Sequence, residues 1–87
     1  MHEFSLMADL VKKINQVIEE QKANRVTGVT VSLGALSHIS AGHFREHFEH
    51  AVAGTTIENA QLNIVQETDI NNPRAQDIIL ESVECEE

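Results

Sequence analysis

Hydrophobic residues recur every three or four positions over the first fifth of the chain. The apolar positions of this stretch are Leu6, Met7, Leu10, Val11, Ile14, Val17 and Ile18. The other side of the pattern is filled by polar residues, namely Lys12, Lys13, Asn15, Gln16, Glu19 and Glu20. This period places the apolar side chains on one face of a helix. The sequence therefore predicts an amphipathic helix that begins near Ser5.

An alternating pattern follows, in which every second residue is apolar. Its apolar members are Val29, Val31 and Leu33. Alternation of this kind is typical of a strand with one buried face. Val26 lies out of phase with the other apolar residues, so we expect a β-bulge at Gly28. Gly34 is expected to end the strand.

A second helical pattern begins after Ser40, whose side chain suits a helix N-cap. Its expected apolar stripe consists of Phe44, Phe48, Ala51 and Val52. Gly54 is expected to stop the helix.

Two further strands are predicted in the last third of the chain. Ala60, Leu62 and Ile64 alternate with Gln61, Asn63 and Val65. Residues 78–85 form the other strand pattern, whose phase shifts between Leu80 and Val83. The order helix, strand, helix, strand, strand indicates the α/β (α+β) class. We expect a small two-layer domain, with a three-stranded sheet packed against two helices.

Composition narrows the functional classes. The chain has 87 residues and a formal net charge of -8, with six basic residues against fourteen acidic ones. Nucleic-acid binding depends on Lys and Arg, so this balance argues against a nucleic-acid partner. No apolar run approaches the roughly 20 residues that cross a bilayer, and no secretory signal pattern is present. We therefore expect a cytoplasmic protein with no membrane partner.

The first residues, Met1-His2-Glu3, can form a metal chelate. The terminal amine, the amide nitrogen of His2 and the Nδ1 atom of its imidazole can close adjacent chelate rings on one ion. Nitrogen donors in a plane suit Ni(II) or Cu(II) better than zinc or calcium. The motif supplies three donors, so the fourth position of a square-planar ion stays open.

Five short segments occur in a fixed order along the chain. They are Met1-His2-Glu3-Phe4-Ser5-Leu6, Arg25-Val26-Thr27-Gly28-Val29, Leu33-Gly34-Ala35-Leu36-Ser37, Phe48-Glu49 followed by Gly54-Thr55, and Ala60-Gln61-Leu62-Asn63-Ile64. In this order they resemble the HypA/HybF family of nickel metallochaperones for hydrogenase maturation. The resemblance extends over about residues 1–66 and resumes at residues 77–84.

The resemblance implies that this domain binds Ni(II) and delivers it during maturation of nickel–iron hydrogenase, with urease as a further recipient. It implies that His2 is the principal nickel ligand, that Met1 contributes its amine, and that Glu3 belongs to the same motif. The implied partners are the maturation GTPase of the nickel insertion pathway and the hydrogenase large subunit. A homodimer is compatible with the sequence.

Two positions compete for the fourth nickel ligand. An acidic residue of the family often lies close to the nickel, and the position that aligns with it here is Ser40. Serine is a poor nickel ligand, whereas the imidazole of His38, in the same loop, is a good one. His38 is therefore the expected ligand, and a solvated loop histidine is the alternative.

The family's zinc-binding lobe is missing. Its members carry two Cys-x-x-Cys pairs inserted before the final strand, whereas residues 67–76 fill that position here and Cys85 is the sole cysteine. A structural zinc site needs about four protein ligands. We therefore expect residues 1–87 to form a single nickel-binding domain without structural zinc.

A second group of histidines consists of His43, His47 and His50, which share one face of the second predicted helix. The segment 43–47 also matches the His-x-x-Glu-His pattern of inverted zinc peptidases. A solvated helix face is the simplest interpretation, an accessory metal site the next, and a zinc hydrolase the weakest. No nucleophile turn or phosphate loop is present, so we expect no enzyme. The main alternative to metal delivery is a protein interaction module of the same fold.

Overall fold

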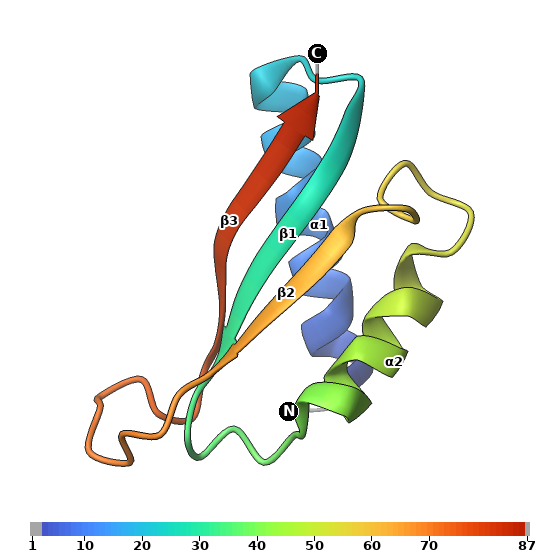
Figure 1. Cartoon of the computed structure of the whole chain (residues 1–87). Helices are drawn as coiled ribbons and strands as arrows, with labels where there is room; N and C mark the ends of the chain where they lie inside the picture. Colours follow the sequence, from blue (N-terminus) through green and yellow to red (C-terminus); the bar gives the residue numbers. More distant parts are fainter. Residues whose placement is uncertain (1–2, 87) are drawn as a thin grey trace.

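The computed structural model describes residues 3–86, with side chains from residue 7 onward. Two helices and three strands follow one another in the predicted order (Figure 1). They are α1 (Glu3–Gln21), β1 (Arg25–Leu33), α2 (Ala41–Val52), β2 (Gln61–Gln66) and β3 (Ile78–Glu86). The predicted class and architecture are confirmed.

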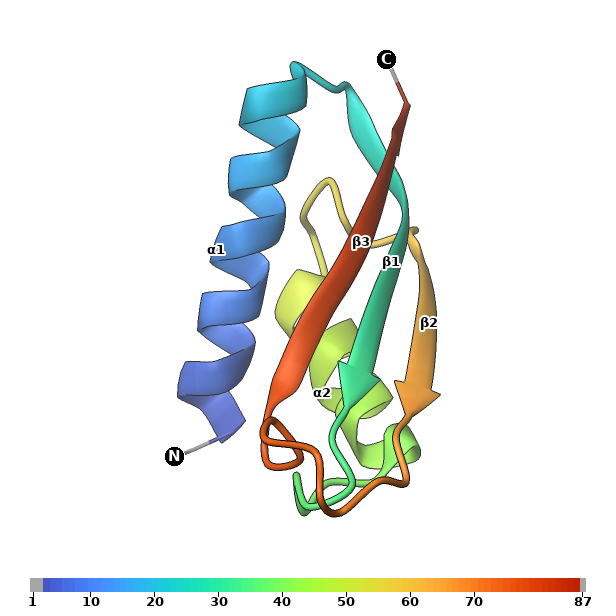
Figure 2. The same ribbon diagram turned by 90° about the vertical axis from the view of Figure 1, so that its left-hand side faces the viewer.

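The three strands form one mixed sheet in the order β2-β1-β3. The central strand β1 pairs with β2 in parallel, through the crossover that contains α2, and with β3 in antiparallel orientation. Both helices cover the same face of the sheet, and the other face carries no helix (Figure 2). Consequently α2 lies over the β2 side of the sheet and α1 over the β3 side.

The core lies between the helices and the sheet. Its fully buried members are Ile14, Val29, Val31, Leu33, Phe44, Phe48, Val52 and Ile57. The expected stripes supply most of them, because each helix turns its apolar face to the sheet. Ala51 is a correction, since it is exposed rather than part of the buried stripe of α2. Helix α1 also begins at Glu3, two residues before the predicted start at Ser5.

Two irregularities of the sheet explain the phase shifts in the sequence. The register between β1 and β3 shifts between Val26 and Gly28, so Val26 reaches the core despite its odd phase. It shifts again between Thr30 and Val31, which pair with Ser82 and Leu80, respectively. The predicted bulge at Gly28 and the predicted phase change after Leu80 are therefore both confirmed.

The connections end the elements where the sequence indicated. The Oγ atom of Ser40 accepts a hydrogen bond of 3.1 Å from the amide of His43, which confirms the N-cap of α2. Gly54 has a φ of 80°, a left-handed conformation that favours glycine, two residues after the helix ends. At Gly34, an added Cβ would lie 2.1 Å from the carbonyl oxygen of Ala75. Only glycine therefore allows the connection between β2 and β3 to pack against the end of β1.

Candidate metal site

The side chains of the predicted ligands Met1, His2 and Glu3 are not among the described parts of the chain. Met1 and His2 lie outside the described residues, and only the backbone of Glu3, the first residue of α1, is described. The first half of α1 lies beside α2, and the two helices are in contact (Figures 1 and 2). Met1, His2 and Glu3 thus remain predicted ligands, and the helix that begins at Glu3 contacts both α2 and β3.

His38 lies in the loop that joins β1 to α2. The loop is at the same end of the molecule as the start of α1 in both views (Figures 1 and 2). His38 has a φ of 61°, which is the left-handed region that few non-glycine residues adopt, and its side chain is exposed. An exposed imidazole at this end of the fold is compatible with the predicted fourth ligand, which stays a prediction.

Ser40 is engaged elsewhere. Its hydroxyl oxygen accepts the hydrogen bond from the His43 amide, so it serves the start of α2. A hydroxyl in that role is poorly suited to replace a carboxylate ligand. The structure therefore gives Ser40 a capping role.

The three histidines of α2 divide into a pair and a single residue. The rings of His43 and His47 have centroids 4.6 Å apart and are tilted by 34°. His47 is half-buried, while His43 and His50 are exposed. Among the side chains that the structure describes, residues 7–86, no three of His, Cys, Asp or Glu are arranged to hold a metal ion. The part of the chain described here thus offers no third ligand of the kind that the zinc peptidase pattern requires.

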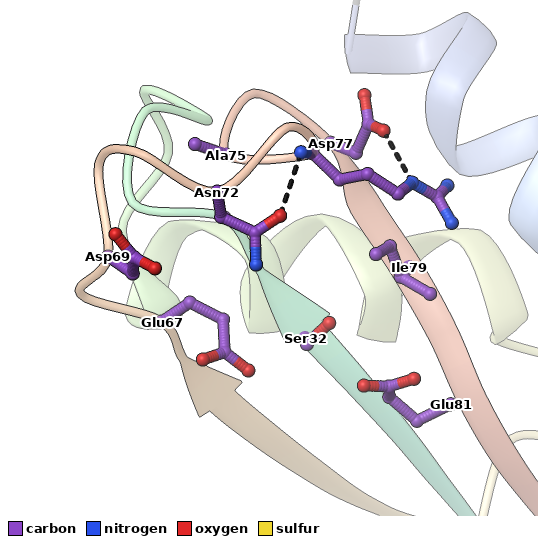
Figure 3. A pocket seen from close by; sticks show the side chains of 10 residues that line it. Ser32, Glu67, Asp69, Asn72, Ala75, Asp77, Ile79 and Glu81 are labelled. Atoms are coloured by element: carbon purple, nitrogen blue, oxygen red, sulfur yellow. Dashed lines mark hydrogen bonds and ion pairs between the residues drawn. The ribbon is translucent and has the colours of Figure 1, made fainter.

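A polar cavity that the sequence did not reveal lies beside the connection between β2 and β3 (Figure 3). It has a volume of about 190 Å³, and its lining includes the carboxylates of Glu67, Asp69, Asp77 and Glu81. Arg74 is the basic residue of this lining, and its Nε atom donates to Asp77 at 2.8 Å. The cavity therefore has an excess of negative charge.

Ser32 forms part of the cavity wall from the central strand and is only 3% exposed. It belongs to the polar positions of β1, which the alternation places on the sheet face without helices. A polar residue on that face is normally solvated, so its burial depends on the neighbouring connection. Residues 67–77 are held in place by the hydrogen bonds from the amides of Gly34 and Leu36 to Asp77 and Ala75, at 2.9 and 2.7 Å. Such long-range packing leaves no periodic signal in the sequence.

Comparison with known proteins shows the family to which the sequence belongs. Residues 1–72 match the protein family described as "Hydrogenase/urease nickel incorporation, metallochaperone, hypA". The chain is 36% identical over 64 residues to the hydrogenase maturation factor HypA of a Picosynechococcus species. It is 39% identical over 64 residues to the hydrogenase maturation factor HybF of Salmonella typhimurium. Each alignment covers 74% of this chain and 57% of the relative, so the chain spans a little over half the length of these relatives.

Solved structures show the same fold. The solution structure of the Ni metallochaperone HypA from Helicobacter pylori superimposes with a TM-score of 0.83 at 18% identity, covering 99% of this chain and 98% of that chain. A second solution structure, titled as HypA protein, gives a TM-score of 0.76 and covers 98% of this chain and 96% of that chain. The family match extends over most of the chain and includes the Met-His-Glu start. The chain belongs to the HypA family of hydrogenase and urease nickel metallochaperones.

Proposed function

We propose that this protein binds Ni(II) as cargo and delivers it during maturation of nickel–iron hydrogenase, with urease as a further recipient. The observation that carries the proposal is the family match over residues 1–72, which contains the Met1-His2-Glu3 chelate motif. The relatives named above are themselves hydrogenase maturation factors. The proposed role is that of a carrier and not of an enzyme.

The proposed cargo site uses the first two residues of the chain and one loop. The amine of Met1, the amide nitrogen of His2 and the imidazole of His2 supply nitrogen donors in one plane, and His38 supplies the fourth. Ni(II) accepts this planar geometry, whereas zinc prefers a tetrahedron. Glu3 lies next to these donors along the chain, where its carboxylate adds negative charge near the cation.

Delivery needs a partner because the chain has no nucleotide-binding loop of its own. We infer that the partner is the GTPase of the nickel insertion pathway and that the hydrogenase large subunit receives the metal. No helix within residues 3–86 is long and apolar enough to cross a membrane. We further propose that the protein acts in the cytoplasm.

The chain is further proposed to be one nickel-binding domain, residues 1–87, in which residues 67–76 stand where the family's zinc lobe is inserted. The close packing of this connection against Gly34 supports the proposal, because the connection joins β2 to β3 and packs on the sheet without a metal-bound lobe. We expect a strong chelator to leave the circular dichroism spectrum unchanged. A loss of helical signal would mean that a metal holds the fold together.

A nickel titration with two forms of the full chain tests the proposed function. The first form has the native free amine, and the second carries one extra residue before Met1 as the matched control. We expect the first form to bind one equivalent of Ni(II) with the d–d absorption of a planar, low-spin site. The extra residue, or His2→Ala, should abolish that absorption. Equal spectra and affinities in all forms would contradict the cargo site and leave a protein interaction module of the same fold.

A further inference from the structure

Ser32 is a buried polar residue whose hydroxyl opens into the acidic cavity beside the connection between β2 and β3. The residue is 3% exposed, and its hydroxyl forms no hydrogen bond with another side chain of residues 7–86. Among those same residues, no fully buried side-chain oxygen or nitrogen lacks a partner, so the Ser32 oxygen is accessible from the cavity. Figure 3 shows this oxygen pointing into the cavity. Because buried hydroxyls are normally hydrogen-bonded, this one needs a partner that the cavity holds.

Two carboxylates of the cavity are available to a ligand. Glu67 follows the end of β2 and Glu81 belongs to β3, and the two side chains lie on either side of Ser32 (Figure 3). Neither carboxylate forms a hydrogen bond or an ion pair with another residue in the described part of the chain. The carboxylates of Asp69 and Asp77 already accept hydrogen bonds within the connection, at 2.9 and 2.8 Å. A cation that enters the cavity therefore meets two carboxylates that no basic side chain neutralises.

The strands on both sides of Ser32 add apolar surface. Val65 of β2 and Ile79 of β3 are the cross-strand partners of Ser32, so they project from the same face of the sheet. Val65 is 45% exposed, and Ile70, in the connection, is 61% exposed. Exposed apolar side chains with polar groups around them are typical of protein contact surfaces. The surface around the cavity therefore suits a protein segment better than a free ion.

We propose that this cavity binds an arginine side chain of a partner protein. An arginine combines an aliphatic stem with a planar cationic head, which matches the apolar surface of Val65 and Ile79 beside the carboxylates of Glu67 and Glu81. Its guanidinium group has five N–H donors in a fixed fork, so it can donate to the Ser32 oxygen and to a carboxylate at once.

The arrangement of the acceptors distinguishes a guanidinium from a compact cation. A metal ion needs several ligand atoms that converge on one point, and a lysine ammonium is likewise a point charge. Within residues 7–86, no three side chains of His, Cys, Asp or Glu converge in this way. Acceptors that are spread around a cavity suit the spread donors of a guanidinium. The formal net charge of -8 also favours the approach of a basic partner.

The position of the cavity gives such a contact a use in metal delivery. The connection between β2 and β3 lies at the same end of the molecule as the start of α1 (Figures 1 and 2). A partner that is held by this cavity is therefore held at the end of the fold where the predicted nickel ligands enter it. This use rests on the proposed function, whereas the existence of the arginine site does not.

The test is an NMR titration of the metal-free full chain with the tripeptide Leu-Arg-Leu, blocked at both ends. We expect the backbone amide signals of Ser32, Glu67 and Glu81 to shift together and to saturate. The same peptide with citrulline, which has the shape of arginine without its charge, should leave these signals unchanged. The peptide with lysine should bind more weakly than the arginine peptide, because an ammonium does not reach the spread acceptors at once.

Variants of the chain locate the site. Glu67→Gln and Glu81→Gln should each weaken binding of the arginine peptide about two- to fivefold, which is the range of an exposed ion pair. Glu20→Gln removes an exposed carboxylate from α1 and is the matched control, which should leave the affinity unchanged. Ser32→Ala should weaken binding without lowering the melting temperature, since its hydroxyl has no partner among the described side chains.

Three results would overturn the proposal. The first is equal binding of the citrulline and arginine peptides, and the second is an equal loss of affinity in Glu20→Gln and Glu67→Gln. The third is tighter binding of free arginine or Ca²⁺ than of the peptide, which would make the cavity a small-molecule or metal site. Because the chain carries no nickel throughout, none of these results bears on the cargo site.

Discussion

The predicted nickel chelate at the chain start and the histidine pair on helix α2 are assembled in opposite ways. At the chain start, the predicted nitrogen donors come from consecutive residues, so chain connectivity alone brings them together. On α2, His43 and His47 meet only because the intervening residues are helical. An arrangement of the first kind is encoded locally and depends little on the fold, whereas an arrangement of the second kind exists only in the folded domain.

Unfolding should distinguish the two arrangements most strongly. In concentrated urea, we expect the native chain to retain planar nickel absorption from Met1 and His2, because those donors need no tertiary structure. The contact between the rings of His43 and His47 should disappear from the NMR spectrum, since an isolated helix of 12 residues is marginal in water. The measurement is absorption and calorimetry in the presence and absence of urea, with the amine-blocked chain as the control. Planar nickel absorption by the blocked chain in urea would show that the chelate does not need the free amine.

Removal of His38 should have a smaller effect, confined to one site. We expect His38→Ala to weaken the first nickel equivalent and alter the planar spectrum, because the fourth donor is then water. The variant should stay folded, since surface substitutions usually change stability by less than about 0.5 kcal/mol. In urea the difference between His38→Ala and the native protein should vanish, because only the fold brings the loop to the chain start. An unchanged first equivalent in the folded variant would make His38 a solvated loop residue.

The smallest effect on metal binding is expected at Ser40. Ser40→Ala removes the hydroxyl that accepts the hydrogen bond from the His43 amide and should cost about 1 kcal/mol of unfolding free energy. It should leave the cargo site unchanged. Thermal or urea denaturation measures the cost, and Ser40→Asp is the matched variant that keeps a capping oxygen. A large loss of nickel affinity in Ser40→Ala, recovered in Ser40→Asp, would instead return this position to the ligand set.

Local periodicity explains why the fold could be predicted from the sequence. The stripes of α1 and α2 and the alternation of β1 reflect burial on one face, and the two phase shifts correspond to the two shifts in register. The helical pattern predicts a core position for Ala51 because it lies beside the stripe, yet Ala51 is exposed in the structure. Ile57 and Ala75 are buried in connections, where no period marks them.

The candidate sites were predictable to different degrees. The faces of His43, His47 and His50 followed from helical spacing, but the contact between the rings of the first two depends on rotamers that spacing does not determine. The cavity beside Ser32 could not be foreseen, because it requires residues 67–77 to fold back over a strand far away in the sequence. The N-terminal chelate stays a prediction from the motif and the family.

The antiparallel pairing of β1 with β3 has a consequence for folding. It joins residues far apart in the chain, as in the hydrogen bond of 2.8 Å between Arg25 and Glu86, which are 61 positions apart. The parallel pairing of β1 with β2 closes a shorter segment, so we expect the β1-α2-β2 unit to form first and β3 to add last. Doubling the length of a flexible connection costs only about 0.6 kcal/mol of closure entropy. The step that adds β3 can therefore accommodate very different lengths between β2 and β3, and the same sheet can form with a short connection or with an inserted lobe.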